Sequence, residues 1–266
     1  MATARDSVEP AGEPRFVTVP SVRQTWHGRR PSGLEGAIVH FDAGRTRPPG
    51  TAADPEYGAR ATLAGSQAQG FAFVTISRSG TLYLPANMDW EAWGYHAGAS
   101  RCPATGRSGV SRFYAGFELN SPGLVFPTAD PDLFLPWYEA AHDARGNPIL
   151  DKEGHARPAR EGGETYARAQ VRLVAARTGN IKPGAYVPYT PAQQAALEGV
   201  LLWLCAQYPK SFRLDRVFGH DEVAPTRKAD PGGSLGEGAE AMPMAAFRER
   251  LGGLWRGGGA SAPDRA

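Results

Sequence analysis

The order of apolar and polar residues predicts short strands in the first half of the chain. Gly36 to Phe41 is a continuous, β-branched apolar run, which is typical of a strand buried on both faces. Residues 71 to 77 alternate, and the turn at 78 to 80 predicts a hairpin with residues 81 to 84. Residues 112 to 120 also alternate with a period of two, so a further strand is expected there.

The strand predicted at 112 to 120 has two different faces. One face carries only apolar side chains, and the other carries Tyr114, Gly116 and Glu118. A carboxylate that shares a face with a glycine is poor design for a core. We therefore expect Glu118 to point into a cavity, although an edge strand with one wet face would give the same pattern.

Helices are predicted mainly toward the end of the chain. Asp54 and Pro55 suit an N-cap and first helical position. Thr190, Pro191 and Gln193 form the strongest start, a capping box. The apolar residues that follow recur at three- and four-residue spacing, namely Leu197, Val200, Leu201, Leu204, Cys205 and Tyr208. A last amphipathic helix is expected over 243 to 255, with these residues inward: Phe247, Leu251, Leu254 and Trp255.

Between the Glu118 strand and the Thr190 helix the pattern loosens. Prolines interrupt residues 121 to 189, turn residues near Gly146 and Gly154 predict a small hairpin, and 164 to 178 suggest a helix ended by Gly179. We interpret 121 to 189 as an insertion in a single domain spanning 15 to 256. Residues 1 to 14 and 257 to 266 are expected to be flexible tails.

Composition and charge exclude several classes of protein. The chain has 266 residues, with 29 Lys+Arg against 27 Asp+Glu, and it shows no basic stripe, so we expect no nucleic-acid partner. No apolar run approaches the length of a membrane span, and the N-terminus lacks the apolar segment of a signal peptide. Synthesis in the cytoplasm is therefore expected. The two cysteines are expected to be free thiols.

The stretch from Phe218 to Gly233 concentrates candidate chemistry. It holds His220, Lys228 and Asp230, and its prolines and glycines predict a loop. A histidine and an aspartate on one loop can both reach a metal ion. Lysine is rare here, since the other lysines are Lys152, Lys182 and Lys210. A solvated, charged surface loop remains the alternative explanation of the same residues.

Two further segments carry candidate site residues. His40 stands at the end of the first predicted strand, where an isolated histidine is more often a hydrogen-bonded core residue than a metal ligand. Residues 87 to 100 are rich in glycine and aromatic rings, which favours a groove wall offering stacking faces to sugars. Ordinary aromatic packing would explain that composition equally well.

Four segments in order resemble a known family. They are Ala37-Ile-Val-His40, Trp93-Gly-Tyr-His96-Ala-Gly, Gly116-Phe-Glu118-Leu and the stretch from Gly219 to Gly232. This set resembles the zinc-dependent N-acetylmuramoyl-L-alanine amidases of type 2, which share a fold with T7 lysozyme and the peptidoglycan recognition proteins. Only the last motif is specific by itself, but the ordered set is hard to obtain by chance.

The resemblance implies an α/β fold, with a central mixed β-sheet flanked by helices and a groove that holds one Zn2+ per chain. It implies that the residues divide into three roles, as zinc ligands His40, His220 and Asp230, catalytic residues Glu118 and Lys228, and substrate contacts His96, Trp93 and Arg227. A three-histidine site with His96 in place of Asp230 is the alternative ligand set. Phe41 stands where members often have a second histidine or an asparagine, which puts sugar contacts there in doubt.

The implied reaction is hydrolysis of the amide between N-acetylmuramic acid and L-alanine of peptidoglycan. A non-catalytic peptidoglycan-binding relative and a hydrolase of another amide are the alternatives. Because residues 121 to 189 could lengthen the groove, we favour an enzyme that lyses polymeric cell wall. We expect it to be a monomer that is released or injected from the cytoplasm. A cytoplasmic enzyme that recycles soluble anhydro-muropeptides is the competing role.

Overall fold

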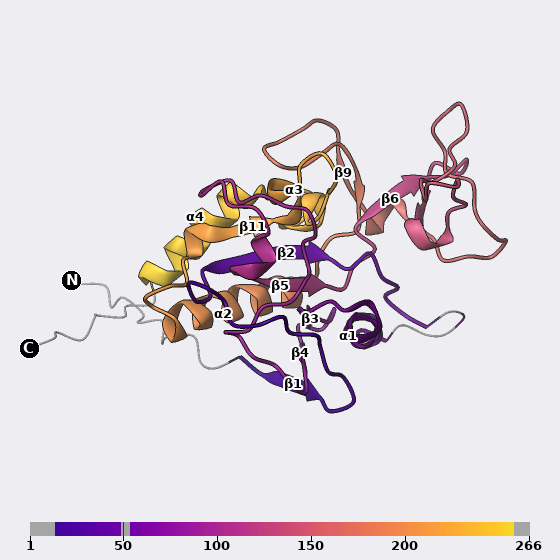
Figure 1. Ribbon diagram of the computed structural model, residues 1–266. Helices are drawn as coiled ribbons and strands as arrows, with labels where there is room; N and C mark the ends of the chain where they lie inside the picture. Colours follow the sequence, from indigo (N-terminus) through magenta and orange to yellow (C-terminus); the bar gives the residue numbers. More distant parts are fainter. Residues whose placement is uncertain (1–13, 49, 51–53, 258–266) are drawn as a thin grey trace, which may run out of the picture.

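A six-stranded mixed sheet forms the centre of the computed structural model, which describes residues 14–48, 50 and 54–257 (Figure 1). The strand order is β1-β4-β3-β5-β2-β11, and only β3 and β4 pair antiparallel. The strands are β1 (Phe16–Val19), β2 (Gly36–Phe41), β3 (Val74–Ile76), β4 (Leu82–Pro85), β5 (Tyr114–Leu119) and β11 (Val217–Gly219). The mixed α/β fold that the resemblance implied is therefore confirmed.

The predicted strands pair as neighbours at the centre of this sheet. β2 lies between β5 and β11, and its residues Ala37, Ile38 and Val39 are fully buried. A strand that is covered on both faces must be apolar along its whole length, which explains the run in the sequence. The β2–β5 register places His40 beside Glu118. The hairpin of β3 and β4 also forms where the alternation predicted it.

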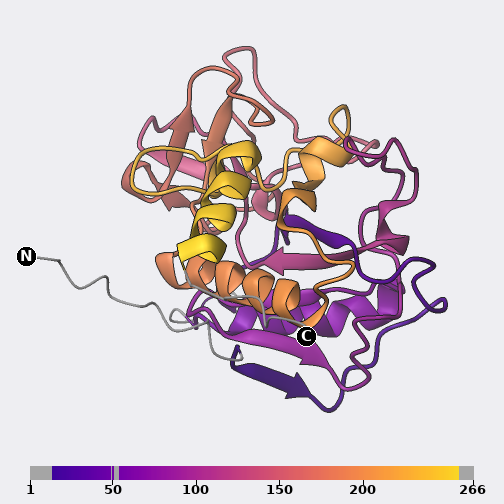
Figure 2. The same ribbon diagram turned by 90° about the vertical axis from the view of Figure 1, so that its left-hand side faces the viewer.

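Helices cover the two faces of the sheet. Their bounds are α1 (Tyr57–Gln69), α2 (Pro191–Gln207), α3 (His220–Val223) and α4 (Met244–Gly257). α2 and α4 lie on the same side of the sheet (Figure 2), where they pack in one core cluster with the apolar face of β5. α1 contacts β3 and β4, and it packs on β4 in a separate core cluster. The opposite face of β5, which carries Glu118, is thus free of α2 and α4.

The two long predicted helices form with small differences. α2 begins with the expected capping box of Thr190 and Gln193. α4 buries Phe247 and Leu251, but Leu254 and Trp255 are 41% and 38% exposed, so the prediction that they face inward is wrong. The helix continues past the edge of the core there. Both cysteines are free thiols, as expected.

α1 begins later than its capping residues predicted. Asp54 lies in a turn before the helix, where its carboxylate accepts the backbone N–H of Glu56 at 2.9 Å. Glu56 is the N-cap and makes no side-chain cap. A local turn has therefore taken the hydrogen-bonding capacity that the sequence assigned to the helix.

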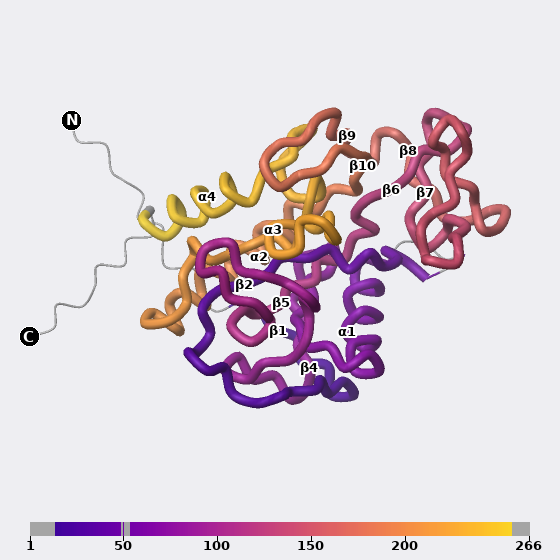
Figure 3. The backbone as a smooth tube through the Cα atoms, turned by 45° about the horizontal axis from the view of Figure 1, so that its top comes forward, coloured from indigo at the N-terminus to yellow at the C-terminus, as the bar shows by residue number. Residues whose placement is uncertain are grey.

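A second sheet is built from residues between β5 and α2. Its order is β8-β7-β6-β10-β9, all antiparallel, and Figures 1 and 3 show β6 and β7 at one end of the molecule. The strands are β6 (Leu124–Pro127), β7 (Leu133–Pro136), β8 (Tyr166–Ala167), β9 (Arg172–Val174) and β10 (Gly184–Tyr186). The helix predicted over 164 to 178 is wrong, because Tyr166 and Val171 are buried in a cluster with β6, β7 and β10. Strand pairing there overrides helix propensity.

Short 3-10 turns join these elements. They are Val110–Arg112, Trp137–Glu139, Arg168–Gln170, Leu214–Arg216 and Gly232–Ser234. None of the helices in the described part of the chain is long and apolar enough to cross a membrane. The segments expected to be tails lie almost wholly outside the described residues.

Candidate metal centre and active site

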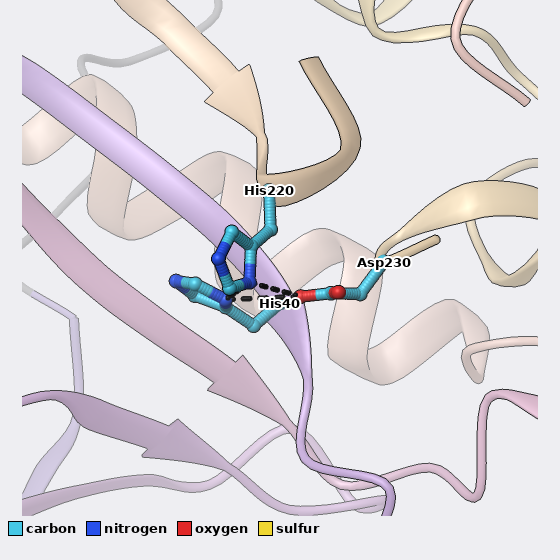
Figure 4. A group of neighbouring side chains, drawn as sticks. All are labelled: His40, His220 and Asp230. Atoms are coloured by element: carbon cyan, nitrogen blue, oxygen red, sulfur yellow. Dashed lines mark hydrogen bonds and ion pairs between the residues drawn. The ribbon is translucent and has the colours of Figure 1, made fainter. Parts of the chain in front are cut away.

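His40, His220 and Asp230 converge at one buried point (Figure 4). His40 ends the apolar part of β2, and His220 follows β11 directly as the first residue of α3. The His40 Nδ1 lies 2.9 Å from His220 Nδ1 and 3.0 Å from Asp230 Oδ2, while His220 Nδ1 lies 2.9 Å from the same oxygen. The segment after β11 was predicted as a loop, but its first four residues form one helical turn, α3.

The outer nitrogens of the two imidazoles are fixed by hydrogen bonds. His220 Nε2 lies 3.1 Å from the carbonyl oxygen of Ala97, which can only accept, so this nitrogen carries the proton. His96 Nε2 likewise donates to the carbonyl of Tyr114 at 2.9 Å, and His96 Nδ1 lies 3.3 Å from His40 Nε2. His96 therefore accepts from His40 Nε2–H.

This hydrogen bonding leaves both Nδ1 lone pairs directed at the cluster. Burial, followed by the charge of His220, lowers the pKa of His40 to about 4, so its ring is neutral near pH 7. Burial also holds the pKa of His96 well below its ordinary value. Two lone pairs and a carboxylate oxygen at this separation repel one another unless a cation lies between them. The donor set of two imidazoles and one carboxylate fits zinc, and the anchored outer nitrogens are typical of metal-binding histidines.

The backbone of the ligands is also held in place. The hydroxyl of Tyr189 donates to the carbonyl of His40 at 3.0 Å, and the amide of Asp221 donates to the carbonyl of Asp230 at 2.8 Å. Tyr189 is 3% exposed. No pattern in the sequence marked Tyr189, because a tyrosine before a helix cap has no local partner that would indicate its role.

Arg30 holds the backbone around His96 in place. Its guanidinium donates to the carbonyl oxygens of Trp90, Ser111 and Tyr114 at 2.9 to 3.0 Å, and it is 9% exposed. The Tyr114 carbonyl is also the acceptor for His96. Arg30 and His96 are thus tied to one oxygen, and sequence analysis missed Arg30.

Glu118 lies beside the three candidate ligands. Its Oε1 is 3.9 Å from His40 Nδ1, and its side chain is 13% exposed. Burial first, and then the charges of Asp230 and Asp42, raise the pKa of Glu118 well above its ordinary value. A carboxylate with a raised pKa is a stronger proton acceptor than an ordinary one, as general base catalysis requires.

The remaining predicted site residues occupy different positions. Lys228 is half-buried, and its positive charge acts to lower the pKa of both Glu118 and His40. Arg227 is exposed, and its Nη2 donates to the carbonyls of Ala97 and Ala99 at 3.0 Å. The ring of Trp93 packs 5.4 Å from that of Tyr95.

A cleft opens directly beside Glu118. Its lining combines α1, the segment after β2 and the residues before β3, and includes Asp42, Arg45, Tyr57, Thr62, Phe71, Phe73 and Glu118. Asp42, which sequence analysis missed, accepts hydrogen bonds from Thr62 and Asn120 at 2.7 and 3.0 Å. It braces the cleft wall.

A second group of acidic and imidazole side chains lies in the hairpin after β7. Asp151, Glu153 and His155 could bring three ligand atoms together, but they are exposed or half-exposed. Asp151 accepts the backbone N–H groups of Glu153 and His155 at 3.0 and 2.8 Å, so the turn itself accounts for the grouping.

Comparison with known proteins identifies the family. The family model described as N-acetylmuramoyl-L-alanine amidase matches residues 28–233. The chain belongs to this family, and it is an enzyme, a peptidoglycan amidase. The match includes every residue placed in the site above, and it confirms the resemblance read from the sequence motifs. No sequence among the curated proteins matches the chain.

Several solved structures are similar to the chain. A selenomethionine derivative of AmpD is 21% identical and covers 90% of this chain and 94% of its own, with a TM-score of 0.44. AmiD from E. coli, in complex with an anhydro-N-acetylmuramic acid peptide substrate, is 16% identical. The match covers 86% of this chain and 61% of AmiD, with a TM-score of 0.44. The endolysin amidase LysCS from Clostridium intestinale is 13% identical, with coverage of 91% and 98% and a TM-score of 0.41.

Proposed function

We propose that His40, His220 and Asp230 hold one zinc ion and that the enzyme hydrolyses the amide between the lactyl group of N-acetylmuramic acid and L-alanine. The convergence of two Nδ1 lone pairs and one carboxylate oxygen carries this proposal. Zinc held by these residues would act as a Lewis acid and would lower the pKa of a water molecule to about 7.

Glu118 is the proton carrier of the proposed reaction. It stands 3.9 Å from His40 and lines the cleft, so it can reach a water molecule and the leaving nitrogen of a bound amide. Its raised pKa lets it accept a proton from water and then donate one to the amine.

Lys228 is the oxyanion stabiliser of the proposed reaction. Its positive charge acts on both Glu118 and His40, which supports a role in stabilising the negative charge that the amide oxygen gains as its carbon becomes tetrahedral. His96 is the orienting group for His40, since both of its ring nitrogens are engaged within the protein. Arg227 orients His220 indirectly, by holding the Ala97 carbonyl.

The substrate we propose is polymeric peptidoglycan, cleaved by a monomeric enzyme that is released or injected to reach the wall. The second sheet, β8-β7-β6-β10-β9, supports this choice because it is attached to the cleft wall. Arg45 in that wall forms ion pairs with Glu139 and Glu164, which lie in the loops that connect the strands of the second sheet. A wall lengthened in this way suits a long substrate better than a small soluble fragment.

The experiment that tests the chemistry is Glu118→Gln. This variant should keep about one zinc per chain and its thermal stability, while hydrolysis falls by a factor of about 100 or more. Zinc is measured by elemental analysis, and His220→Ala serves as the variant that should lose it. A fully active Glu118→Gln protein, or a wild type that takes up no zinc from supplemented medium, would refute the mechanism.

The substrate is tested by parallel digestion of sacculi and of a soluble anhydro-muropeptide, with products read by mass spectrometry. Hydrolysis of sacculi with new L-alanine amino termini is the expected result. A protein that ignores sacculi but turns over the anhydro-muropeptide rapidly would instead be a recycling enzyme.

A further inference from the structure

An aromatic surface extends outward from the rim of the cleft. We call it the aromatic strip, and it consists of His27, Phe71, Trp93 and Tyr95. Phe71 and Tyr95 are 39% and 49% exposed, His27 is exposed, and Trp93 is half-buried. Exposed aromatic rings that lie next to one another commonly mark a binding surface.

The rings of the strip are held in place before any ligand arrives. The His27 ring lies 4.7 Å from that of Tyr95 and 5.1 Å from that of Trp93. The Arg112 guanidinium lies 5.6 Å from the Trp93 ring. A pre-ordered aromatic surface loses little side-chain entropy when it binds, which favours recognition of a ligand.

The backbone beneath the strip joins three distant segments. The amide of His27 donates to the carbonyl of Trp93, and the amide of Ala72 donates to that of Tyr95, both at 2.8 Å. Gly94 permits this approach, since a Cβ there would lie 2.3 Å from the Ala72 Cβ and 2.6 Å from the Thr25 carbonyl oxygen. The backbone contacts between these segments therefore fix the position of the strip.

The strip is continuous with the proposed active site. Phe71 lines the same cleft as Glu118. Tyr95 directly precedes His96, whose ring contacts His40. A ligand whose reacting end lies at Glu118 and that leaves the cleft past Phe71 would run over Tyr95 and His27.

The charge around the strip indicates a neutral ligand. Arg29, the exposed cation next to His27 and Gly28, is paired with Asp89 and Glu91. Arg112 is directed at the face of Trp93. No carboxylate or ammonium belongs to the strip, so ring faces are what it offers. The C–H face of a pyranose packs on such rings, while the sugar hydroxyl groups stay hydrated.

We infer that the aromatic strip binds the glycan chain of the substrate, at N-acetylhexosamine units beyond the one that carries the scissile amide. This inference rests on the proposed function, because it takes peptidoglycan as the substrate. It makes the strip a determinant of polymer preference. A muropeptide with one sugar fills the cleft beside Phe71 and leaves the rings of His27, Trp93 and Tyr95 bare.

Tyr95→Ala and Tyr95→Phe test the inference as a pair. The alanine removes the ring face, and the phenylalanine keeps it. One aromatic contact corresponds to an affinity change of about 2- to 12-fold. Tyr95→Ala should therefore lower kcat/KM on sacculi by that factor relative to kcat/KM on N-acetylmuramoyl-tripeptide, and Tyr95→Phe should restore most of the ratio. Trp255→Ala is the matched control, since Trp255 is a 38% exposed ring on α4 and should leave both substrates unaffected.

A binding measurement separates this inference from the proposed reaction. The Glu118→Gln protein is incubated with glycan strands stripped of their peptides, and the bound fraction is compared with that of Glu118→Gln/Tyr95→Ala. Weaker retention of the double variant is expected, by about 2- to 12-fold. Equal retention of the two proteins, or an equal loss on both substrates in the kinetic experiment, overturns the glycan assignment. Wild-type protein that hydrolyses neither substrate refutes the proposed function, while the peptide-free strands still decide what the strip binds.

Discussion

Glu139→Gln tests whether the second sheet is anchored to the cleft wall by buried charge. The Glu139 side chain is 2% exposed, and its oxygens accept from Arg45 Nη1 and from Arg160 Nε and Nη2, the last two at 3.0 Å. Arg45 also stacks 4.4 Å from the centre of the Tyr138 ring. The substitution keeps the shape of the side chain and removes its charge.

The expected loss of stability follows from the exposure of each partner. Removing one member of a buried ion pair costs about 3 to 5 kcal/mol. Arg160 is 56% exposed and can return to water, and Arg45 keeps a second partner in Glu164 at 3.6 Å. We therefore expect a loss of about 2 to 3 kcal/mol in the free energy of unfolding. At about 2 to 4 °C per kcal/mol, Tm should fall by about 4 to 12 °C.

Calorimetry and urea denaturation measure this loss, and Asp215→Asn provides the control. Asp215 pairs with Arg213 at 2.8 Å, but both side chains are more than half exposed, so its loss should change stability by less than about 1 kcal/mol. A Glu139→Gln protein as stable as wild type, or one no less stable than Asp215→Asn, would refute the anchoring argument.

The stability difference should also depend on pH. Burial alone would raise the pKa of Glu139, but hydrogen bonds from Arg160 and Arg45 outweigh it and hold the pKa below its ordinary value. A carboxyl with a lowered folded pKa stabilises the protein above its unfolded pKa of about 4.3, and that contribution disappears as pH falls through the folded pKa. The gap between wild type and Glu139→Gln should stay constant from about pH 7 to pH 5 and narrow below about pH 4.

Two further predictions concern the site and the core. His96→Ala removes the acceptor for His40 Nε2–H, so the affinity of the protein for zinc should fall about 10- to 100-fold, as measured by chelator competition. If zinc affinity is unchanged while activity is lost, His96 is a substrate contact instead. Cys205→Ala leaves a small cavity where half-buried Cys205 packs against the core, so stability should fall by about 1 to 2 kcal/mol with zinc content and bond specificity unchanged, whereas loss of zinc would contradict its placement.

Predictions from the sequence succeeded where the determining contacts are local or repeat regularly. The capping box of Thr190 and Gln193 involves residues three apart, and α2 begins where it predicts. The continuous apolar run of β2 matches its central place in the sheet. The alternation in β5 placed Glu118 on the face opposite the core cluster of α2 and α4, and Glu118 does line a cleft.

Errors arose where a distant segment competes with a local preference. Residues 164 to 178 have a composition that suits a helix, yet they pair with β7 and β10. Asp54 has the side chain of an N-cap but is used in a turn. Leu254 and Trp255 follow the helical period of α4 into solvent, because the core ends before the helix does.

The sequence by itself determined which residue types are present for the chemistry, along with the strands and helices that carry them. Tertiary structure alone decided how those residues are held. His40 lies 180 residues from His220 and 190 from Asp230, and they meet because β11 pairs with β2 in parallel register. The hydrogen bonds that Arg30, Tyr189 and Asp42 make around the site also depend on the folded chain. Their partners lie far away in the chain, so no local pattern could indicate them, and only the folded chain brings donor and acceptor within reach.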